Sequence, residues 1–176
     1  ASKVGKNKLE KTRNKALIEI LYASGMRVSE LVSLRKSLFI GAPEIILIKG
    51  KGNKERMVPI SKLALSATKK YLVELKKSNI EFYKSEFLFP SRSKNGYLNR
   101  EKFFLIIKKI AKFAGLNSQY VSPHKIRHAF ASHLLSNGAD LRVIQTLLGH
   151  KNLSTTEIYT HILDEKIMKS VQENHP

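Results

Sequence analysis

The chain has 176 residues, no cysteine and a formal net charge of +18, from 32 Lys and Arg against 14 Asp and Glu. The absence of cysteine excludes disulfides and thiolate metal sites, and no apolar run is long enough to span a membrane, so we expect a cytoplasmic protein. A positive charge this large, spread from end to end, predicts a polyanionic partner, most simply nucleic acid. The alternative is a lysine-rich surface that contacts only solvent.

The N-terminal third is expected to form two helices followed by a sheet. Residues 1–8 are basic and without periodicity, which predicts a linker or a frayed N-terminal end. Apolar residues at helical spacing predict a helix over 9–24, ended by Gly25, and a second over 28–34. Three short strands are expected over 37–40, 44–48 and 56–60. The fold class is therefore α+β, mainly helical, with a small three-stranded antiparallel sheet.

Arg27 lies at the junction of the first two helices, directly after Gly25 and Met26. Backbone donors are free at such a junction, so an anion could bind there. The alternative is a surface arginine that pairs with Glu30. The residues alone leave both readings open.

The turn between the second and third expected strands is a basic hairpin tip with two glycines, Gly50-Lys51-Gly52-Asn53. A lysine at such a tip can reach a groove in nucleic acid. Lys49, Lys51 and Lys54 are all candidates, and the alternative is a phosphate-binding loop without chemistry.

The middle of the chain is expected to be structural. An amphipathic helix over 61–79 has Ser61 as its N-cap, and a polar connection follows over 78–85. Asn99 is expected to cap a helix over 100–114, whose aromatic stripe is interpreted as core and not as a platform for stacked bases.

Residues 122–161 combine several groups that suit phosphate chemistry. His124, Arg127 and His128 fall within one and a half helical turns. Apolar helices are expected over 129–135 and 141–148, with a turn at 138–140 between them. His150 follows the second helix, and Tyr159 comes nine residues later. An arginine and histidines can stabilise a phosphate and move protons, and a tyrosine can be a nucleophile.

These segments resemble the boxes of the tyrosine recombinases, the lambda-integrase family. His124-Lys125-Ile126-Arg127-His128 resembles the H-x-x-R box, Leu148-Gly149-His150 the L-G-H box and Tyr159-Thr160-His161 the nucleophile box. ILYASGMRVSELVSL, residues 20–34, resembles the first arginine box, and KGKGNKERMVP, residues 49–59, the lysine hairpin. The five boxes occur in family order over nearly the whole chain, and they are most similar to the Xer branch.

The resemblance implies a site-specific recombinase that cleaves and rejoins DNA through a 3′-phosphotyrosyl intermediate, without metal or ATP, in chromosome dimer resolution. It assigns the phosphate arginines to Arg27 and Arg127, the general acid to Lys51 and the nucleophile to Tyr159. His124 is expected to accept the tyrosine proton or hold the phosphate, and His150 to hydrogen-bond the phosphate or Tyr159. Glu30 and His128 are expected to support the site. The basic residues expected to contact DNA are Lys49, Lys54, Arg56 and Arg92.

The resemblance also implies partners and domains. Family members act as four protomers on two DNA sites, so DNA and sister subunits are expected partners, with an activator protein as a further one. We expect a catalytic domain over 9–163 and a C-terminal helix over 164–176. This helix either packs on its own domain or, as is common in the family, docks on a neighbouring subunit. The family's N-terminal DNA-clasping domain is not in this sequence, so the chain is expected to be the catalytic half of a longer protein. Asn14 replaces a carboxylate that the family often has.

Two other functions are compatible with part of the sequence. Residues 131–148 have the pattern of a helix-turn-helix, which could bind DNA without chemistry. His124 and His128, four residues apart, with His133 further along, could bind a metal. However, residue 125 is Lys where a metalloprotease helix has Glu, and the cationic surroundings oppose a dication. We therefore expect no metal, and hydrogen-bonding roles for His128 and His133.

Overall fold

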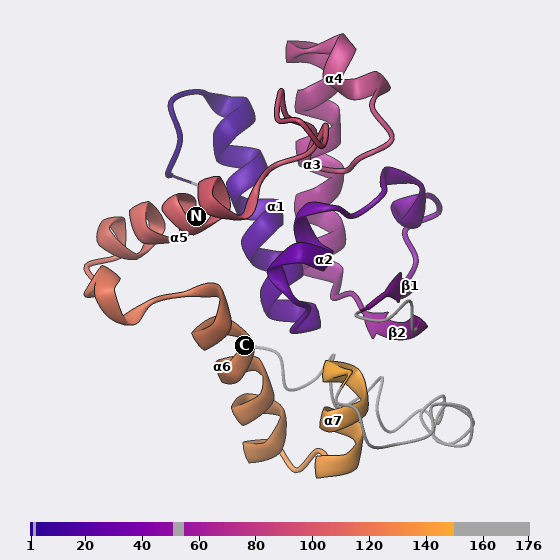
Figure 1. Cartoon of the computed structure of the whole chain (residues 1–176), viewed down its shortest axis with the longest axis vertical. Helices are drawn as coiled ribbons and strands as arrows, with labels where there is room; N and C mark the ends of the chain where they lie inside the picture. Colours follow the sequence, from indigo (N-terminus) through magenta and orange to yellow (C-terminus); the bar gives the residue numbers. More distant parts are fainter. Residues whose placement is uncertain (2, 51–54, 150–176) are drawn as a thin grey trace.

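Two long antiparallel helices form the centre of the fold in a computed structural model that describes residues 1, 3–50 and 55–149. Helix α1 (Lys8–Ser24) packs along α3 (Lys62–Ser78), as Figure 1 shows. The caps are those expected: Gly25 ends α1 at φ 56°, and the Ser61 hydroxyl accepts from the Ala64 amide at 3.2 Å. These helices are fixed by local sequence signals, because a cap and an apolar stripe require no distant partner.

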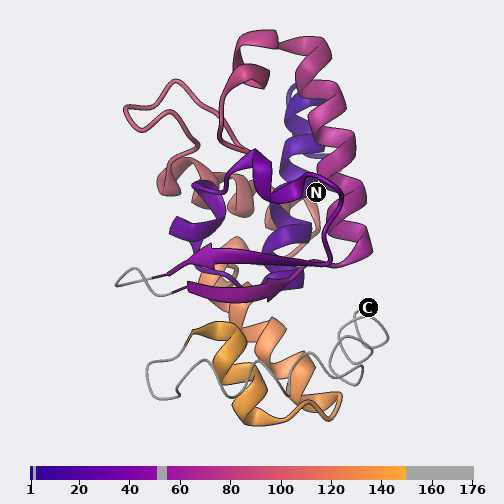
Figure 2. The same cartoon turned by 90° about the vertical axis from the view of Figure 1, so that its right-hand side faces the viewer.

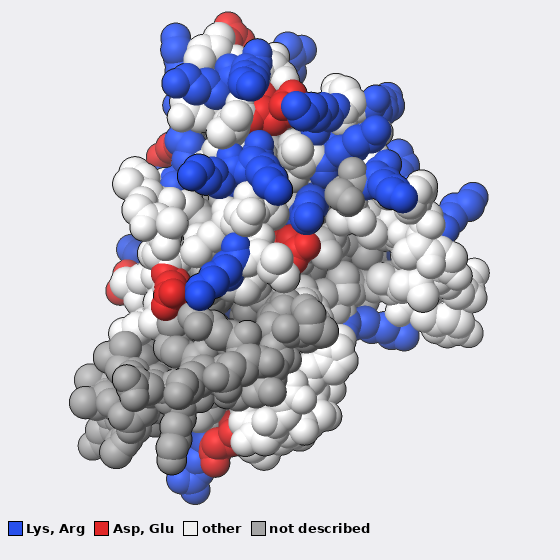
Figure 3. Space-filling model, turned by 180° about the vertical axis from the view of Figure 1, so that it is seen from behind, with Lys and Arg blue, Asp and Glu red and all other residues white. Residues whose placement is uncertain are grey.

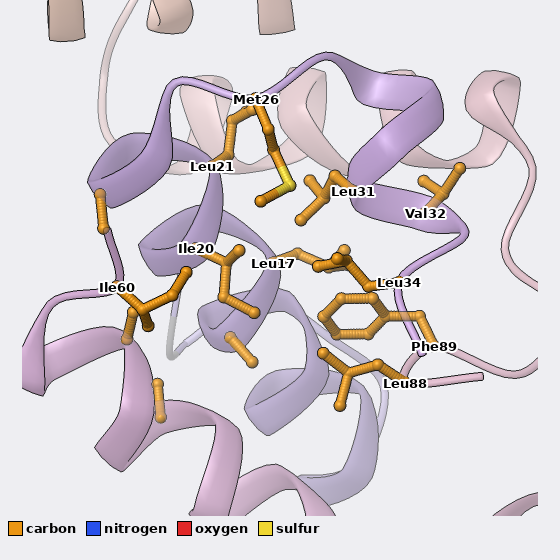
Figure 4. Close-up of a cluster of buried hydrophobic side chains, with 14 of the residues drawn as sticks. Leu17, Ile20, Leu21, Met26, Leu31, Val32, Leu34, Ile60, Leu88 and Phe89 are labelled. Atoms are coloured by element: carbon orange, nitrogen blue, oxygen red, sulfur yellow. The ribbon is translucent and has the colours of Figure 1, made fainter. Parts of the chain in front are cut away.

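The main core lies between α1, α2 (Val28–Val32) and α3, and buried residues of the segments 46–60 and 88–107 complete it. Figure 4 shows Leu17 and Ile20 of α1 beside Leu31, Leu34 and Phe89. Met26 also points into this core, so the α1–α2 junction that bears Arg27 is anchored by a buried neighbour, with Met26 only 1% exposed.

The N-terminal residues are in part packed against α1. The Asn7 side chain accepts from the Glu10 amide at 2.9 Å and caps the helix. Asn14 is buried, donates to the Val4 carbonyl at 2.8 Å and accepts from the Arg13 guanidinium. The amide at position 14 therefore has local partners where the family often has a carboxylate.

Among the residues that the structure describes, the sheet has two strands, so the expectation of three was wrong. Strands β1 (Ile45–Lys49) and β2 (Glu55–Pro59) are antiparallel, with Ile46 opposite Val58 and Ile48 opposite Arg56. The first expected strand is instead a 3₁₀ helix, η1 (Lys36–Phe39), which buries none of its residues. The Lys36 amide donates to the Glu86 carbonyl at 2.8 Å, so a distant segment, and not a neighbouring strand, holds this turn.

The connection after α3, which the sequence pattern predicts as a polar loop, contains a short helix. Helix α4 (Ile80–Lys84) begins at Asn79, whose side chain accepts from the Phe82 amide at 3.0 Å. Leu88 and Phe89 then return to the core, and Pro90 forms an isolated bridge with Tyr97.

Helix α5 (Arg100–Phe113) has the expected Asn99 cap, but its apolar stripe is only in part core. Phe103 and Ile107 are buried, whereas Phe104 is 42% and Phe113 61% exposed. The helix extends away from the main body in Figure 1, so its far end, with η3 (Ser118–Tyr120), has little to pack against. The prediction that all these aromatic residues are core was wrong.

The last described helices pack on each other as a separate layer. Helix α6 (Pro123–Ser136), capped by Ser122, and α7 (Leu141–Leu148) share a small apolar cluster. That cluster consists of Phe130, Leu134, Ile144, Leu147 and Leu148. Figure 2 shows the β hairpin between this layer and the α1–α3 body, and α7 contacts β2. In the described part of the chain, no helix combines the length and apolar character needed to cross a membrane.

Candidate active site

The turn between α1 and α2 sets the position of Arg27. The Arg27 amide donates to Glu30 Oε2 at 2.7 Å, and its Nη1 donates to Glu30 Oε1 at 3.2 Å. The sequence was compatible with an anion site at Arg27 or with a pairing between Arg27 and Glu30, and the structure contains this pairing. This pairing does not bury Arg27 completely, because its side chain is still 37% exposed and lines a pocket.

Glu30 is the buried centre of an arginine cluster. Arg56, from β2, donates to both of its carboxylate oxygens at 2.8 and 2.7 Å. Burial alone would raise the pKa of Glu30, but the hydrogen bonds and charges of Arg56 and Arg27 outweigh it and lower that pKa. Glu30 is therefore an anion at neutral pH, as a supporting residue that orients arginines must be.

Arg127 reaches the same region from α6. Its Nη1 donates to the Gly25 carbonyl at 2.7 Å and its Nη2 to the Leu148 carbonyl at 2.6 Å. Burial, together with the charges of Arg27 and Arg56, lowers the pKa of Arg127 to about 10. The guanidinium remains charged at neutral pH.

The C-terminal end of α7 meets all three arginines. Arg56 Nε donates to the Leu147 carbonyl at 3.1 Å, Arg127 to the Leu148 carbonyl, and Arg27 Nη2 to the Gly149 carbonyl at 3.2 Å. The last carbonyls of a helix have no partner within it, so these cations satisfy them and complement the helix dipole. The next residue in the chain is His150.

Arg27 and Arg127 line one pocket of about 340 Å³ together with His124 and His128. The two histidines are exposed, and their Nε2 atoms lie 2.9 Å apart. Three guanidinium groups and one carboxylate leave this region with surplus positive charge, and Arg27 and Arg127 both line the pocket. The arrangement can bind a phosphate and offers a histidine pair for proton transfer.

The other expected site residues are placed differently or lie outside the described residues. Lys49 is exposed at the end of β1 and pairs with Glu55 at 3.9 Å, and Arg92 is exposed in the loop before α5. Arg56 was expected to contact DNA, but its side chain is 4% exposed and all three of its guanidinium nitrogens bond within the protein. Lys51, Lys54, His150 and Tyr159 lie outside the described residues.

Two contacts of this region were not identified from the sequence. The link from Arg56 to Glu30 and Leu147 spans 26 and 91 residues, and no local pattern marks it. Tyr22 Oη lies 2.5 Å from His133 Nδ1 and joins α1 to α6, which confirms the hydrogen-bonding role expected for His133. Burial raises the pKa of Tyr22.

The fold and pocket define a helical domain with an arginine-rich anion site, and comparison with known proteins assigns its family. Residues 3–166 match the model of the Phage integrase family. The chain therefore belongs to the phage integrase family. This confirms the resemblance to tyrosine recombinases inferred from the sequence boxes.

The similar proteins include Xer recombinases. Tyrosine recombinase XerD of Rhizobium meliloti (strain 1021) is 51% identical over 168 residues, which cover 96% of this chain and 53% of that protein. The crystal structure of XerH bound to difH substrate is 33% identical, with a TM-score of 0.71, over 93% of this chain and 47% of that one. XerA recombinase is 32% identical, with a TM-score of 0.70, over 94% of this chain and 59% of that one. The chain thus spans about half the length of the relatives it matches.

Proposed function

We propose that this chain is the catalytic part of a site-specific DNA recombinase of the Xer type. The observation that carries the proposal is the convergence of Arg27 and Arg127, from helices 100 residues apart in sequence, on one pocket with His124. Two arginine forks can neutralise the non-bridging oxygens of a phosphodiester, which otherwise resists attack. The names of the relatives support the same function, as does the XerH structure, which is a pre-cleavage complex with difH substrate.

The proposed reaction begins with attack of the Tyr159 hydroxyl oxygen on phosphorus. The bond from phosphorus to the 5′-oxygen breaks, and a 3′-phosphotyrosyl link forms. His124 takes the tyrosine proton or holds the phosphate, His150 hydrogen-bonds the phosphate or Tyr159, and Lys51 protonates the leaving 5′-oxygen. The 5′-hydroxyl of a partner strand then attacks the link and releases Tyr159, so the phosphodiester is restored without metal or ATP.

The wider setting follows from the same proposal. The substrate is double-stranded DNA, and the proposed role is chromosome dimer resolution in the cytoplasm by four protomers, with a C-terminal helix on a neighbouring subunit and an activator protein. The charge of +18 supports a polyanionic substrate. Basic side chains are not confined to the pocket: Figure 3 shows Lys and Arg gathered over the part of the far face where α1, α3 and α4 lie.

The test uses DNA nicked near a candidate recombination site, so that a cleaved strand is trapped. The protein is incubated with this DNA as wild type, Tyr159→Phe and Tyr120→Phe; Tyr120 is a control because its side chain is exposed on η3. An adduct that survives denaturation in wild type and Tyr120→Phe, but not in Tyr159→Phe, is expected. Equal salt-dependent binding by all three proteins without an adduct, even with the partner subunit added, would favour a non-catalytic helix-turn-helix protein.

A further inference from the structure

We infer that Arg56 is a positioning residue for the arginine pocket, which it joins to the C-terminal end of α7. The inference rests on the proposed function, because the groups that Arg56 positions are those proposed to bind phosphate. Arg56 itself does not line the pocket with Arg27 and Arg127. It acts through two contacts, one with Glu30 and one with the Leu147 carbonyl.

The contact with Glu30 controls the orientation of Arg27. Arg56 engages both carboxylate oxygens at 2.8 and 2.7 Å, which leaves a single longer bond of 3.2 Å to the Arg27 side chain. Without Arg56, Glu30 would be a buried carboxylate whose nearest cation is Arg27. Arg27 would then be drawn into a two-pronged pair with Glu30, away from the pocket.

The contact with α7 fixes the chain immediately before His150. Arg56 Nε donates to the Leu147 carbonyl at 3.1 Å, in a side chain that is only 4% exposed. The Gly149 backbone lies close to the aliphatic part of the Arg56 side chain, because a Cβ at residue 149 would lie 3.1 Å from Arg56 Cδ. The φ of +67° at Gly149 also favours glycine. Arg56 therefore sets where the chain leaves the helix toward the remaining proposed catalytic residues.

Only arginine can make these contacts together. Its planar fork presents Nε, Nη1 and Nη2 in fixed directions, and Arg56 uses all three. A lysine ammonium would keep the charge beside Glu30 but could not span both carboxylate oxygens and the Leu147 carbonyl. Arg56→Lys therefore keeps the positive charge and removes the planar guanidinium geometry.

The experiment compares wild type with Arg56→Lys and two controls. Arg35→Lys changes an arginine in an exposed ion pair with Glu86, away from the pocket. Leu75→Ala weakens the buried face of α3, and so lowers the melting temperature without touching the site. The measurements are the single-turnover rate of adduct formation on nicked DNA at saturating protein, the Kd for the same DNA and the melting temperature.

Arg56→Lys is expected to lower the adduct rate roughly 10²-fold, the size of effect that a small misplacement of reacting groups can have, with little change in Kd. Arg35→Lys should form the adduct at the wild-type rate. Leu75→Ala should also do so when the assay temperature is well below its melting temperature. Two results would overturn the inference. In the first, Arg56→Lys forms the adduct at the wild-type rate. In the second, Leu75→Ala, with an equal melting temperature, shows the same loss of adduct-formation rate.

Failure of the proposed function can be distinguished from failure of this inference. If wild type forms no adduct, hydrogen exchange tests Arg56 independently of activity. Amides of α7 should then exchange faster in Arg56→Lys than in wild type or Arg35→Lys, with those of α3 unchanged. Unchanged exchange in α7 would show that Arg56 does not hold this helix end.

Discussion

His124 and His128 face each other one turn apart on α6, with their Nε2 atoms 2.9 Å apart. A hydrogen bond between two Nε2 atoms requires that one carries a proton and the other does not. His128 can therefore fix the tautomer of His124, or take a proton from it, while His124 serves the phosphate.

This pair gives the first prediction. His124→Ala should lower the adduct rate roughly 10²–10⁴-fold, the range for loss of an acid–base group. His128→Ala should lower the adduct rate by a smaller factor, because His128 acts through His124. His133→Ala is the control on the same helix, since His133 bonds Tyr22 and does not line the pocket. A larger loss in His128→Ala than in His124→Ala would reverse the two roles.

The second prediction concerns Arg127. Arg127→Lys should lower the adduct rate roughly 10²–10³-fold, as for loss of an oriented oxyanion donor. Lysine can reach one of the Gly25 and Leu148 carbonyls but cannot bridge both and still face the pocket. The rate is measured on nicked DNA at saturating protein. Lys125→Ala, an exposed change on α6, should keep the wild-type rate; equal losses in both variants would refute the role of Arg127.

The third prediction is a pH dependence of stability that comes from Glu30. Its pKa in the folded protein lies below the ordinary value of about 4.3, so the ionised form stabilises the fold above that pH. This stabilisation should be lost as the pH falls through the folded-state pKa. Urea unfolding at pH 6, 4 and 3 should show a steeper loss for wild type than for Glu30→Gln.

Glu30→Gln should also cost roughly 3–5 kcal/mol near neutral pH, because Arg56 is left buried without its anion. Glu86→Gln is the matched control, since the Arg35–Glu86 pair is exposed. It should retain the acid sensitivity of wild type. A Glu30→Gln variant that loses stability with acid as steeply as wild type would contradict the prediction.

The fourth prediction concerns the close approach at Gly25. A Cβ at this residue would lie 2.3 Å from Phe130 Cδ1, and its φ is +56°. Gly25→Ala should destabilise the fold by roughly 2–5 kcal/mol, because crowding adds to backbone strain. Gly138→Ala is the control, with a φ of +86° but nothing within 4 Å, and should cost only about 1–2 kcal/mol. The free energy of unfolding is measured with urea. If Gly25→Ala and Gly138→Ala lose equal amounts, backbone strain alone accounts for the effect at Gly25.

The long helices and the family could be predicted from the amino-acid sequence alone. Helix α3 begins after Ser61 and α5 after Asn99, as their caps indicate. The boxes around Arg27 and Arg127 were recognised from order and spacing, and the pocket brings these two residues together. Such features were accessible because a cap, an apolar stripe and a motif depend on residues close in sequence.

Which side chains are partners could be read only from the folded structure. Arg56 looks like a DNA contact in a basic hairpin, yet it is buried against Glu30 and Leu147, 26 and 91 residues away. Phe104 and Phe113 continue an apolar stripe but lie where α5 extends past the core. Residues 37–40 resemble a strand but lie mostly in a 3₁₀ helix, Lys36–Phe39, whose first amide bonds to the distant Glu86 carbonyl. Burial and pairing depend on what the rest of the chain places beside a residue, and local pattern does not contain that information.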